Sequence, residues 1–150
     1  MPFIPHHPTA APDGAFALST AQEGLWAAEF LNPESSANVT GQYSEILGAL
    51  DVATFERASR HVIEETEALR LCFGGPADQP QQWVVPLDHW SLPVIDLSGE
   101  PDLRTAALAW METQHARPLD VGSGRAFRWT LLRLGATRFV WSFQVHLGYR

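Results

Sequence analysis

The sequence is poor in cysteine, in basic residues and in long hydrophobic runs. Cys72 is the single cysteine among 150 residues, which excludes a disulfide framework or a cysteine-based zinc site within one chain and fits a reducing compartment. Basic residues number 10 and acidic residues 17, for a formal net charge of −7. Nonspecific nucleic-acid binding needs a basic footprint, so we expect no nucleic-acid partner.

The beginning of the chain carries no targeting or anchoring signal. Residues 1–12 lack the basic start and the apolar run of a signal peptide, and no stretch approaches the roughly 20 apolar residues of a membrane span. We therefore expect a soluble, cytoplasmic protein with no membrane partner. Recurring prolines predict a flexible leader over residues 1–15, ahead of a folded part at 16–150. His6 and His7 lie there without a third ligand, so no metal site is expected.

The remaining composition is globular. Hydrophobic residues make up 45 % of the chain and charged residues 18 %, which leaves ample apolar material for a core. The length fits one domain, or one lobe of a larger domain.

Three helices are predicted from capping residues and apolar spacing. The first begins at Ser19 or Thr20, because each has a glutamine or glutamate three positions later, as in a capping box. Asp51 begins the second, which runs to about Thr66, and Asp102 begins the third. The expected buried positions are Leu18, Ala21, Leu25 and Ala28 in the first helix and Leu103, Ala106, Ala107, Trp110, Met111 and Gln114 in the third.

Alternating apolar residues predict the strands. The expected strands are residues 38–48, 69–73, 82–85, 127–131 and 139–146. The second and third of these would form a hairpin, and the last two would form a long antiparallel pair. Residues 90–97 are expected to be irregular and extended. The elements together predict an α+β fold, a two-layer α/β sandwich.

Taken by themselves, the residues offer little chemistry. The sequence has no glycine-rich phosphate loop, no nucleophile elbow and no zinc-binding helix motif. His146 lies on the strand face opposite an aromatic row. A histidine that leaves the end of a buried strand can serve as a base near neutral pH, and it can equally be structural. Gly122–Gly124 fit either an ordinary turn or a loop that approaches a ligand.

Four ordered segments give the sequence a family resemblance. Residues 18–26 resemble the opening motif of condensation domains, a Ser/Thr-x-Ala-Gln run that leads to Leu-Trp. Residues 67–73 resemble the second motif, an acidic residue followed by Leu-Arg-x-x-Phe, and 117–128 resemble the Pro-Phe/Leu-Asp approach to the penultimate strand. Residues 141–150 run into the place of the His-His-x-x-x-Asp-Gly motif. The chain is thus similar to the N-terminal half of a nonribosomal-peptide-synthetase condensation domain, of the enterobactin-synthetase type in its first segment.

This resemblance implies a fold, a reaction and partners. The fold would be the N-terminal lobe of a chloramphenicol acetyltransferase-like domain, in which a tunnel between two lobes holds the active site. Carrier proteins would deliver donor and acceptor thioesters on phosphopantetheine arms, and the acceptor amine would attack the donor thioester to form an amide. The domain would need no cofactor of its own. Its partners would be peptidyl or acyl carrier proteins, and either the C-terminal lobe or another copy of itself.

The motif positions depart from the family pattern. His146 falls on the first histidine and Leu147 on the second, which is the one implicated in catalysis; leucine has neither a lone pair nor an N–H. The Asp-Gly would follow Arg150, so we expect 16–150 to be a lobe truncated within the motif and inactive as an isolated chain. Arg70 matches the arginine that pairs with that aspartate as structural support. If one histidine has instead been lost, His146 stands for the catalytic one.

Two other functions stay open. One is a noncatalytic half-domain that self-associates or holds a carrier protein, since a lobe without its partner exposes apolar surface. The other is a related activity of the superfamily, such as epimerisation or another acyl transfer. Cyclisation is disfavoured, because it normally replaces the first motif histidine with aspartate, and His146 is present.

Overall fold

The computed structural model describes residues 10–76 and 78–149. Its α-helices are α1 (Thr20–Leu31), α2 (Val52–Glu65) and α3 (Leu103–His115). Its strands are β1 (Phe16–Ala17), β2 (Val39–Leu47), β3 (Leu71–Gly74), β4 (Gln81–Val84), β5 (Val94–Asp96), β6 (Phe127–Gly135) and β7 (Arg138–His146). Short 3-10 turns are η1 (Glu67–Arg70), η2 (Val121–Ser123) and η3 (Leu147–Tyr149).

Local capping fixes the start of each α-helix. The hydroxyl of Ser19 accepts the N–H of Gln22, and the Gln22 side chain accepts the N–H of Ser19, which is the predicted capping box. Asp51 and Asp102 accept N–H groups in the first turns of α2 and α3. All three predicted starts are confirmed, because a cap depends only on neighbours in the sequence.

The buried face of α1 differs from the expected one. Trp26 and Glu29 are the buried residues of the helix, whereas Ala21 and Ala28 are exposed. Leu18 is buried and Leu25 is half-buried, so the predicted stripe was wrong at Ala21 and Ala28. Tertiary contacts selected a face that contains a carboxylate, and apolar spacing alone did not reveal it.

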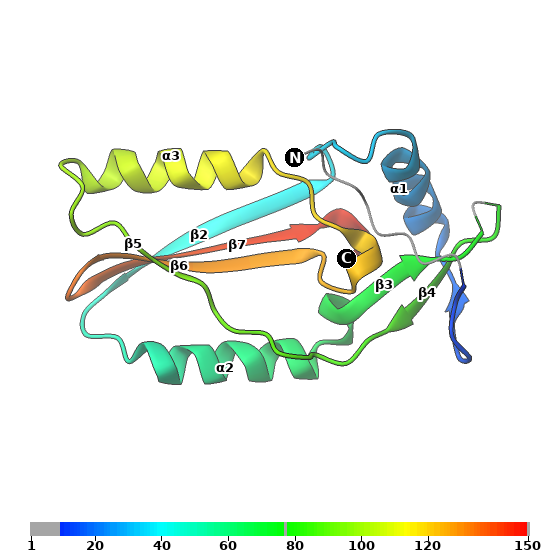
Figure 1. Cartoon of the computed structure of the whole chain (residues 1–150), viewed down its shortest axis with the longest axis horizontal. Helices are drawn as coiled ribbons and strands as arrows, with labels where there is room; N and C mark the ends of the chain where they lie inside the picture. Colours follow the sequence, from blue (N-terminus) through cyan, green and yellow to red (C-terminus); the bar gives the residue numbers. More distant parts are fainter. Residues whose placement is uncertain (1–9, 77, 150) are drawn as a thin grey trace.

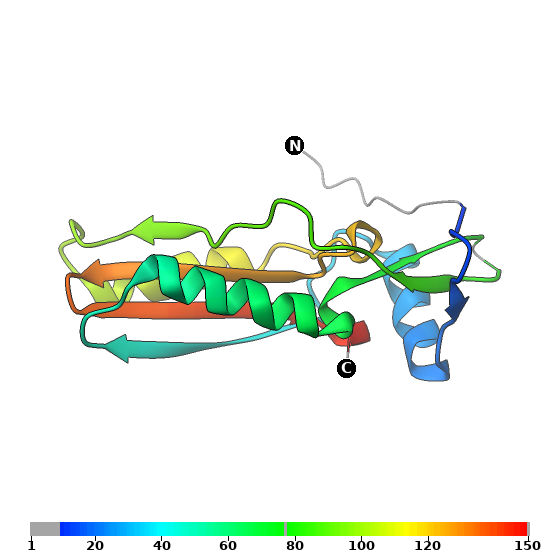
Figure 2. The same cartoon turned by 90° about the horizontal axis from the view of Figure 1, so that it is seen from below.

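Four strands form the main sheet, in the order β2-β7-β6-β5. Figure 2 shows this order from one edge of the sheet to the other. The strand β7 pairs antiparallel with both neighbours, and β5 joins β6 in parallel. The register places Val39 beside His146, so the first long strand lies against the last. The segment expected to be irregular, 90–97, contains the short strand β5.

Helices cover both faces of this sheet. In Figure 1, α3 and α2 lie on opposite sides of the strands. One cluster, which includes Ile63 of α2, Trp129 and Phe139, fills the space under α2; another, with Ala107 of α3 and Val140, fills the space under α3. The α+β class is confirmed. The main sheet and its helices form three layers where two were expected, since β6 and β7 have buried residues on both faces.

A second, smaller sheet closes one end of the molecule. Its order is β1-β4-β3, and β3 and β4 form the predicted hairpin. Figure 1 shows this sheet beside α1 and beyond the end of β7. Leu18, Trp26, Val39, Phe73 and Ala126 belong to the apolar cluster there. This cluster brings α1 and the end of β7 into one core, which positions the site described below.

Residues 1–9 of the expected leader, including His6 and His7, lie outside the described residues. Residues 10–15 form no helix or strand. No helix in the described part of the chain is long and apolar enough to span a membrane.

Candidate functional site

The candidate site lies where β7 ends. His146 is 2 % exposed, and its backbone N–H donates to Ala126 O at 2.9 Å. Strand alternation places it on the face of Ser142 and Gln144, opposite Phe143. The end of a paired strand thus carries an imidazole into the core rather than to the surface.

Both ring nitrogens of His146 are engaged. Its Nε2 lies 3.0 Å from Oε1 of Glu29, and its Nδ1 accepts the N–H of Gly148 at 3.1 Å. An acceptor nitrogen carries no proton, so in this geometry the proton of the ring is on Nε2 and is donated to Glu29. This tautomer is assigned from the hydrogen-bond network. A doubly protonated ring would set an N–H against the N–H of Gly148.

Glu29 and Asn38 complete a buried polar cluster with His146, which we call the His146 cluster. Glu29 is 5 % exposed, and the same Oε1 that faces His146 also accepts Asn38 Nδ2 at 2.9 Å. Removing a carboxylate from water costs about several kcal/mol of free energy unless a charged partner or hydrogen-bond donors offset this desolvation penalty. Two donors on one oxygen provide that compensation, and they join α1 to the end of β7.

The backbone after His146 is held as well. The N–H of Leu147 donates to Asn38 O at 2.8 Å, and Gln22 Nε2 donates to Gly148 O at 3.1 Å. Gln22 is itself held by reciprocal amide bonds with Gln82 of β4, at 3.0 and 2.9 Å. The path of the chain at Leu147 is therefore determined from both sides, by α1 and by the small sheet.

Arg70 lies elsewhere, between the end of α2 and the end of β4. Its guanidinium donates to the backbone oxygens of Ile63 (3.2 Å), Val85 (2.9 Å) and Glu64 (2.9 Å). No carboxylate among the described residues forms an ion pair with it. Three of its five N–H groups are used, so the guanidinium retains donors for a carboxylate. Its role as support for an aspartate stays a prediction.

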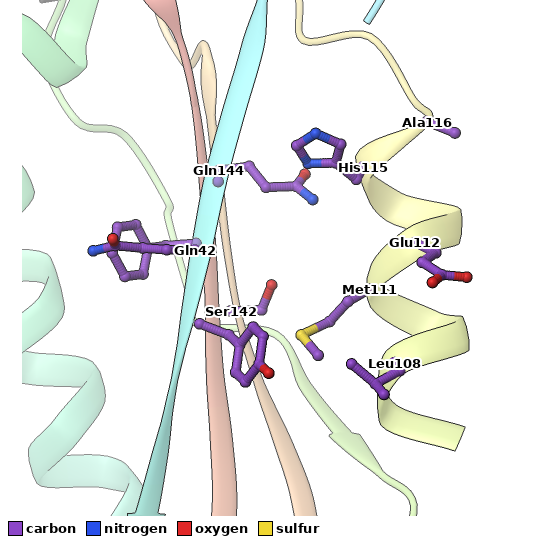
Figure 3. Close-up of a pocket in the computed structure, with 11 residues that line it drawn as sticks. Gln42, Leu108, Met111, Glu112, His115, Ala116, Ser142 and Gln144 are labelled. Atoms are coloured by element: carbon purple, nitrogen blue, oxygen red, sulfur yellow. The ribbon is translucent and has the colours of Figure 1, made fainter. Parts of the chain in front are cut away.

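A groove runs between α3 and the β2–β7 pair. Its volume is about 380 Å³, and Figure 3 shows Leu108, Met111 and Ser142 pointing into it, with Gln144 and His115 near one end. Its lining is mostly apolar. Sequence patterns did not predict it, because it forms where α3 leaves β2 uncovered. Among the described residues, no group of three or more potential metal-ligating side chains could hold a metal ion.

Sequence reasoning found His146, Leu147 and Arg70 but missed the residues around the first two. Gln22 and Glu29 lie on one face of α1 with Leu18 and Trp26, at spacings of four, four and three. Polar residues within a helical apolar stripe are a signal for buried hydrogen bonds. Nothing local marks Asn38, since its contacts arise from the pairing of β2 with β7.

Comparison with known proteins places these features in a family. The family model of the condensation domain matches residues 13–146. A dimodular nonribosomal peptide synthase of Bacillus subtilis is 40 % identical over 134 residues, which is 89 % of this chain and 6 % of that protein. Enterobactin synthase component F of Escherichia coli is 30 % identical over 131 residues, covering 86 % of this chain and 10 % of that protein. The expected likeness to the enterobactin type is thus confirmed.

The fold agrees with solved structures of the same kind. The starter condensation domain of rhizomide synthetase RzmA superposes with a TM-score of 0.83 and 34 % identity, over 91 % of this chain and 33 % of that chain. The chain therefore spans about a third of that domain structure and a small part of the curated synthetases. With the matching family model and four ordered motifs, this chain belongs to the condensation-domain family of nonribosomal peptide synthetases.

Proposed function

We propose that this chain is the N-terminal lobe of a condensation domain and that it supplies no catalytic histidine. Condensation domains of these synthetases act on substrates that carrier proteins hold as phosphopantetheine thioesters. The observation that carries the proposal is the pair His146-Leu147: the histidine is buried and fully engaged, and the residue after it has no ionisable group. The peptidyl or acyl carrier proteins and the C-terminal lobe would be its partners.

Amide formation is faster when the side chain at position 147 can hydrogen-bond to the acceptor amine or accept its proton. The acceptor amine attacks the donor thioester carbonyl, the new C–N bond forms, the C–S bond breaks, and the phosphopantetheine thiol leaves. The attacking nitrogen must also lose a proton. A positioned imidazole can orient the amine or take that proton, and such a group typically contributes about 10²–10⁴-fold in rate. Leu147 can do neither.

His146 is a poor substitute for the missing imidazole. Its Nδ1 lone pair is occupied by the N–H of Gly148, and its Nε2 faces Glu29. To act as a base it would have to give up one of these contacts and reach substrate from a position that is 2 % exposed. The alternative that His146 acts as the catalytic histidine therefore requires rearrangement of the His146 cluster.

A chimera tests the proposal. Residues 13–147 would replace the aligned segment in the condensation domain of the Bacillus subtilis relative, with the rest of that domain unchanged. We expect amide formation between loaded carrier proteins to fall below about 1 % of the parent rate, from the loss of a general base or positioning group. The same chimera with Leu147→His should regain at least about tenfold.

Controls separate catalysis from folding. Both chimeras should show the same thermal unfolding midpoint and the same binding of carrier protein, because position 147 is half-buried and its backbone contacts are unchanged. Amide formation by the Leu147 chimera at the parent rate would overturn the proposal. The isolated 150-residue chain, assayed with the same loaded carrier proteins, is expected to give no product, and turnover by it would also overturn the proposal.

One observation favours a second function, self-association as a noncatalytic half-domain. The outer edge of β2 pairs with no strand among the described residues, and residues 41–45 are exposed. Tyr43 is 53 % exposed and Leu47 is 74 % exposed, and Tyr43 also lines the groove beside α3. A long unprotected edge strand is a template for pairing with another strand. A second copy could pair its β2 antiparallel, about an axis near Tyr43.

Sedimentation velocity over a concentration series tests self-association. We expect a dimer in the wild-type protein and a monomer in the double variant Gln42→Lys/Ser44→Lys, whose lysines would face each other across the pair. The control Ala109→Lys/Thr113→Lys adds the same charge on the exposed side of α3 and should leave the dimer intact. A monomeric wild-type protein at all concentrations would contradict this function.

A further inference from the structure

We infer that Glu29 is a positioning residue, which selects the tautomer of His146 and through it sets the backbone of the motif turn at residues 147–148. This inference deepens the proposed function and rests on it for its meaning, since that turn carries the family's catalytic position. It concerns a carboxylate on α1 that lies 117 positions before the histidine it contacts.

The first step is the burial of Glu29. Glu29 is 5 % exposed in the last turn of α1, next to the apolar cluster that contains Trp26. An apolar residue would be the ordinary choice at such a position. Retaining a carboxylate there is costly unless it is matched by donors. Its partners are Nε2 of His146 at 3.0 Å and Nδ2 of Asn38 at 2.9 Å.

The second step is the choice of tautomer. An unperturbed imidazole has two neutral forms, and the hydrogen bond at one nitrogen decides which nitrogen holds the proton. A carboxylate at Nε2 accepts only, so it holds the proton on Nε2 and leaves Nδ1 as an acceptor. Nδ1 is then free to receive the N–H of Gly148 at 3.1 Å. Without Glu29, the ring can also be protonated on Nδ1, and in that form it cannot accept the N–H of Gly148.

The third step links the ring to the backbone of the turn. The N–H of Leu147 donates to Asn38 O at 2.8 Å, and the oxygen of Gly148 accepts Gln22 Nε2 at 3.1 Å. Asn38 therefore binds Glu29 through its side chain and Leu147 through its backbone. With the bond from Gly148 to the ring, every one of these contacts fixes where the side chain at position 147 points.

Histidine-selective ¹⁵N NMR measures the tautomer directly. At neutral pH we expect the His146 ring of the wild-type protein to be protonated on Nε2 only. In Glu29→Gln the side-chain amide can either accept from Nε2 or donate to it, so the ring is no longer restricted to one form and we expect the form protonated on Nδ1 to become populated. Hydrogen exchange of the Gly148 amide should then accelerate about tenfold or more, the equivalent of one lost hydrogen bond.

Matched variants separate positioning from general destabilisation. Glu34→Gln removes an exposed carboxylate just after α1 and should change neither the tautomer nor the exchange of Gly148. Gln22→Ala removes the bond to Gly148 O but leaves Glu29 in place, so it should speed exchange without moving the proton. A variant that is merely less stable would lower the unfolding midpoint and leave the ring protonated on Nε2.

The ¹⁵N spectrum of the wild-type protein tests the inference by itself, even if Glu29→Gln does not fold. A wild-type ring protonated on Nδ1, or on both nitrogens, would overturn the inference, and so would an unchanged tautomer in folded Glu29→Gln. Neither result depends on amide formation by the chimera. The positioning role of Glu29 and the absence of a catalytic histidine can therefore fail separately.

Discussion

Gly124 ends the short turn η2 with a left-handed backbone, φ +68°, and it is buried against Val85. A Cβ at this position would overlap Val85 Cγ2. The left-handed conformation costs a non-glycine residue roughly 1–2 kcal/mol, and overpacking a core typically costs about 1–3 kcal/mol. We expect Gly124→Ala to lower the free energy of unfolding by about 2–5 kcal/mol, measured by urea denaturation.

A second glycine provides the control. A Cβ at Gly99 would meet nothing within 4 Å, so Gly99→Ala should change stability by less than about 0.5 kcal/mol. Adding Val85→Ala to Gly124→Ala should cost less than the sum of the single changes, because the overlap is then relieved. Equal stability of Gly124→Ala and the wild-type protein would contradict the close approach of Val85.

Cys72 belongs to the same residue scale, and its environment predicts low reactivity. It is 3 % exposed, and its Sγ donates to Gly122 O at 3.0 Å. Burial, assisted by the charge of Asp120, raises the pKa of the thiol from 9.0 to about 11. At pH 8 the thiolate fraction should thus be about 100-fold smaller than in the unfolded chain, and alkylation by iodoacetamide correspondingly slower.

The same shift has a consequence for stability. A thiol with a raised pKa ionises later in the folded state, so the stability it confers is complete below pH 9 and is lost as the pH rises towards 11. Cys72→Ala should lose less stability over this interval than the wild-type protein. Equal alkylation rates for folded protein and for protein in denaturing urea would contradict the burial of Cys72.

At the scale of elements, Arg70 ties the end of α2 to the end of β4. It donates to three backbone oxygens, those of Ile63, Glu64 and Val85. Each hydrogen bond to a charged group contributes about 1.5–3 kcal/mol, part of which is offset by desolvation. We expect Arg70→Met, which keeps the apolar stem, to lower the free energy of unfolding by about 2–4 kcal/mol in urea denaturation.

Two further variants test whether geometry or charge is responsible. Arg70→Lys keeps the charge but cannot span three carbonyls, so it should lose at least half as much stability as Arg70→Met. Arg57→Met, on the exposed side of α2, removes one bond to Thr54 and should cost less than about 1 kcal/mol. A full rescue by lysine would show that the fork geometry of Arg70 is unimportant.

The helices and strands also show which features local sequence patterns can predict. The caps at Ser19, Asp51 and Asp102 were predicted correctly, because each depends on residues within three positions. The strand β5 was missed, since three residues after a proline give no periodicity to detect. The buried face of α1 was predicted only in part for a different reason: Glu29 is stabilised there by Asn38 and by His146, which lies 117 positions away in the sequence.

At the scale of the whole molecule, contacts between residues close in the sequence were predicted, and contacts between distant residues were not. The hairpin of β6 and β7 could be predicted because a short turn joins the two strands. The pairing of β2 with β7 could not, since it joins the first long strand to the last. The contact of Glu29 with His146 needs, in addition, the packing of α1 against the end of β7. The motifs therefore identified the family and the motif histidine, while the neighbours that hold this histidine required the tertiary structure.

The net charge of the molecule gives a last prediction, for the dimer proposed through β2. Two chains that each carry −7 repel, and salt screens this repulsion, since the Debye length falls from about 10 Å at 0.1 M to about 3 Å at 1 M. If backbone pairing and apolar contact hold the dimer, its dissociation constant should fall at least about threefold between roughly 0.05 and 0.5 M NaCl. The Ala109→Lys/Thr113→Lys control, less negative by two charges, should respond more weakly. Sedimentation equilibrium measures both, and a dimer that weakens as salt rises would instead point to ion pairs across the interface.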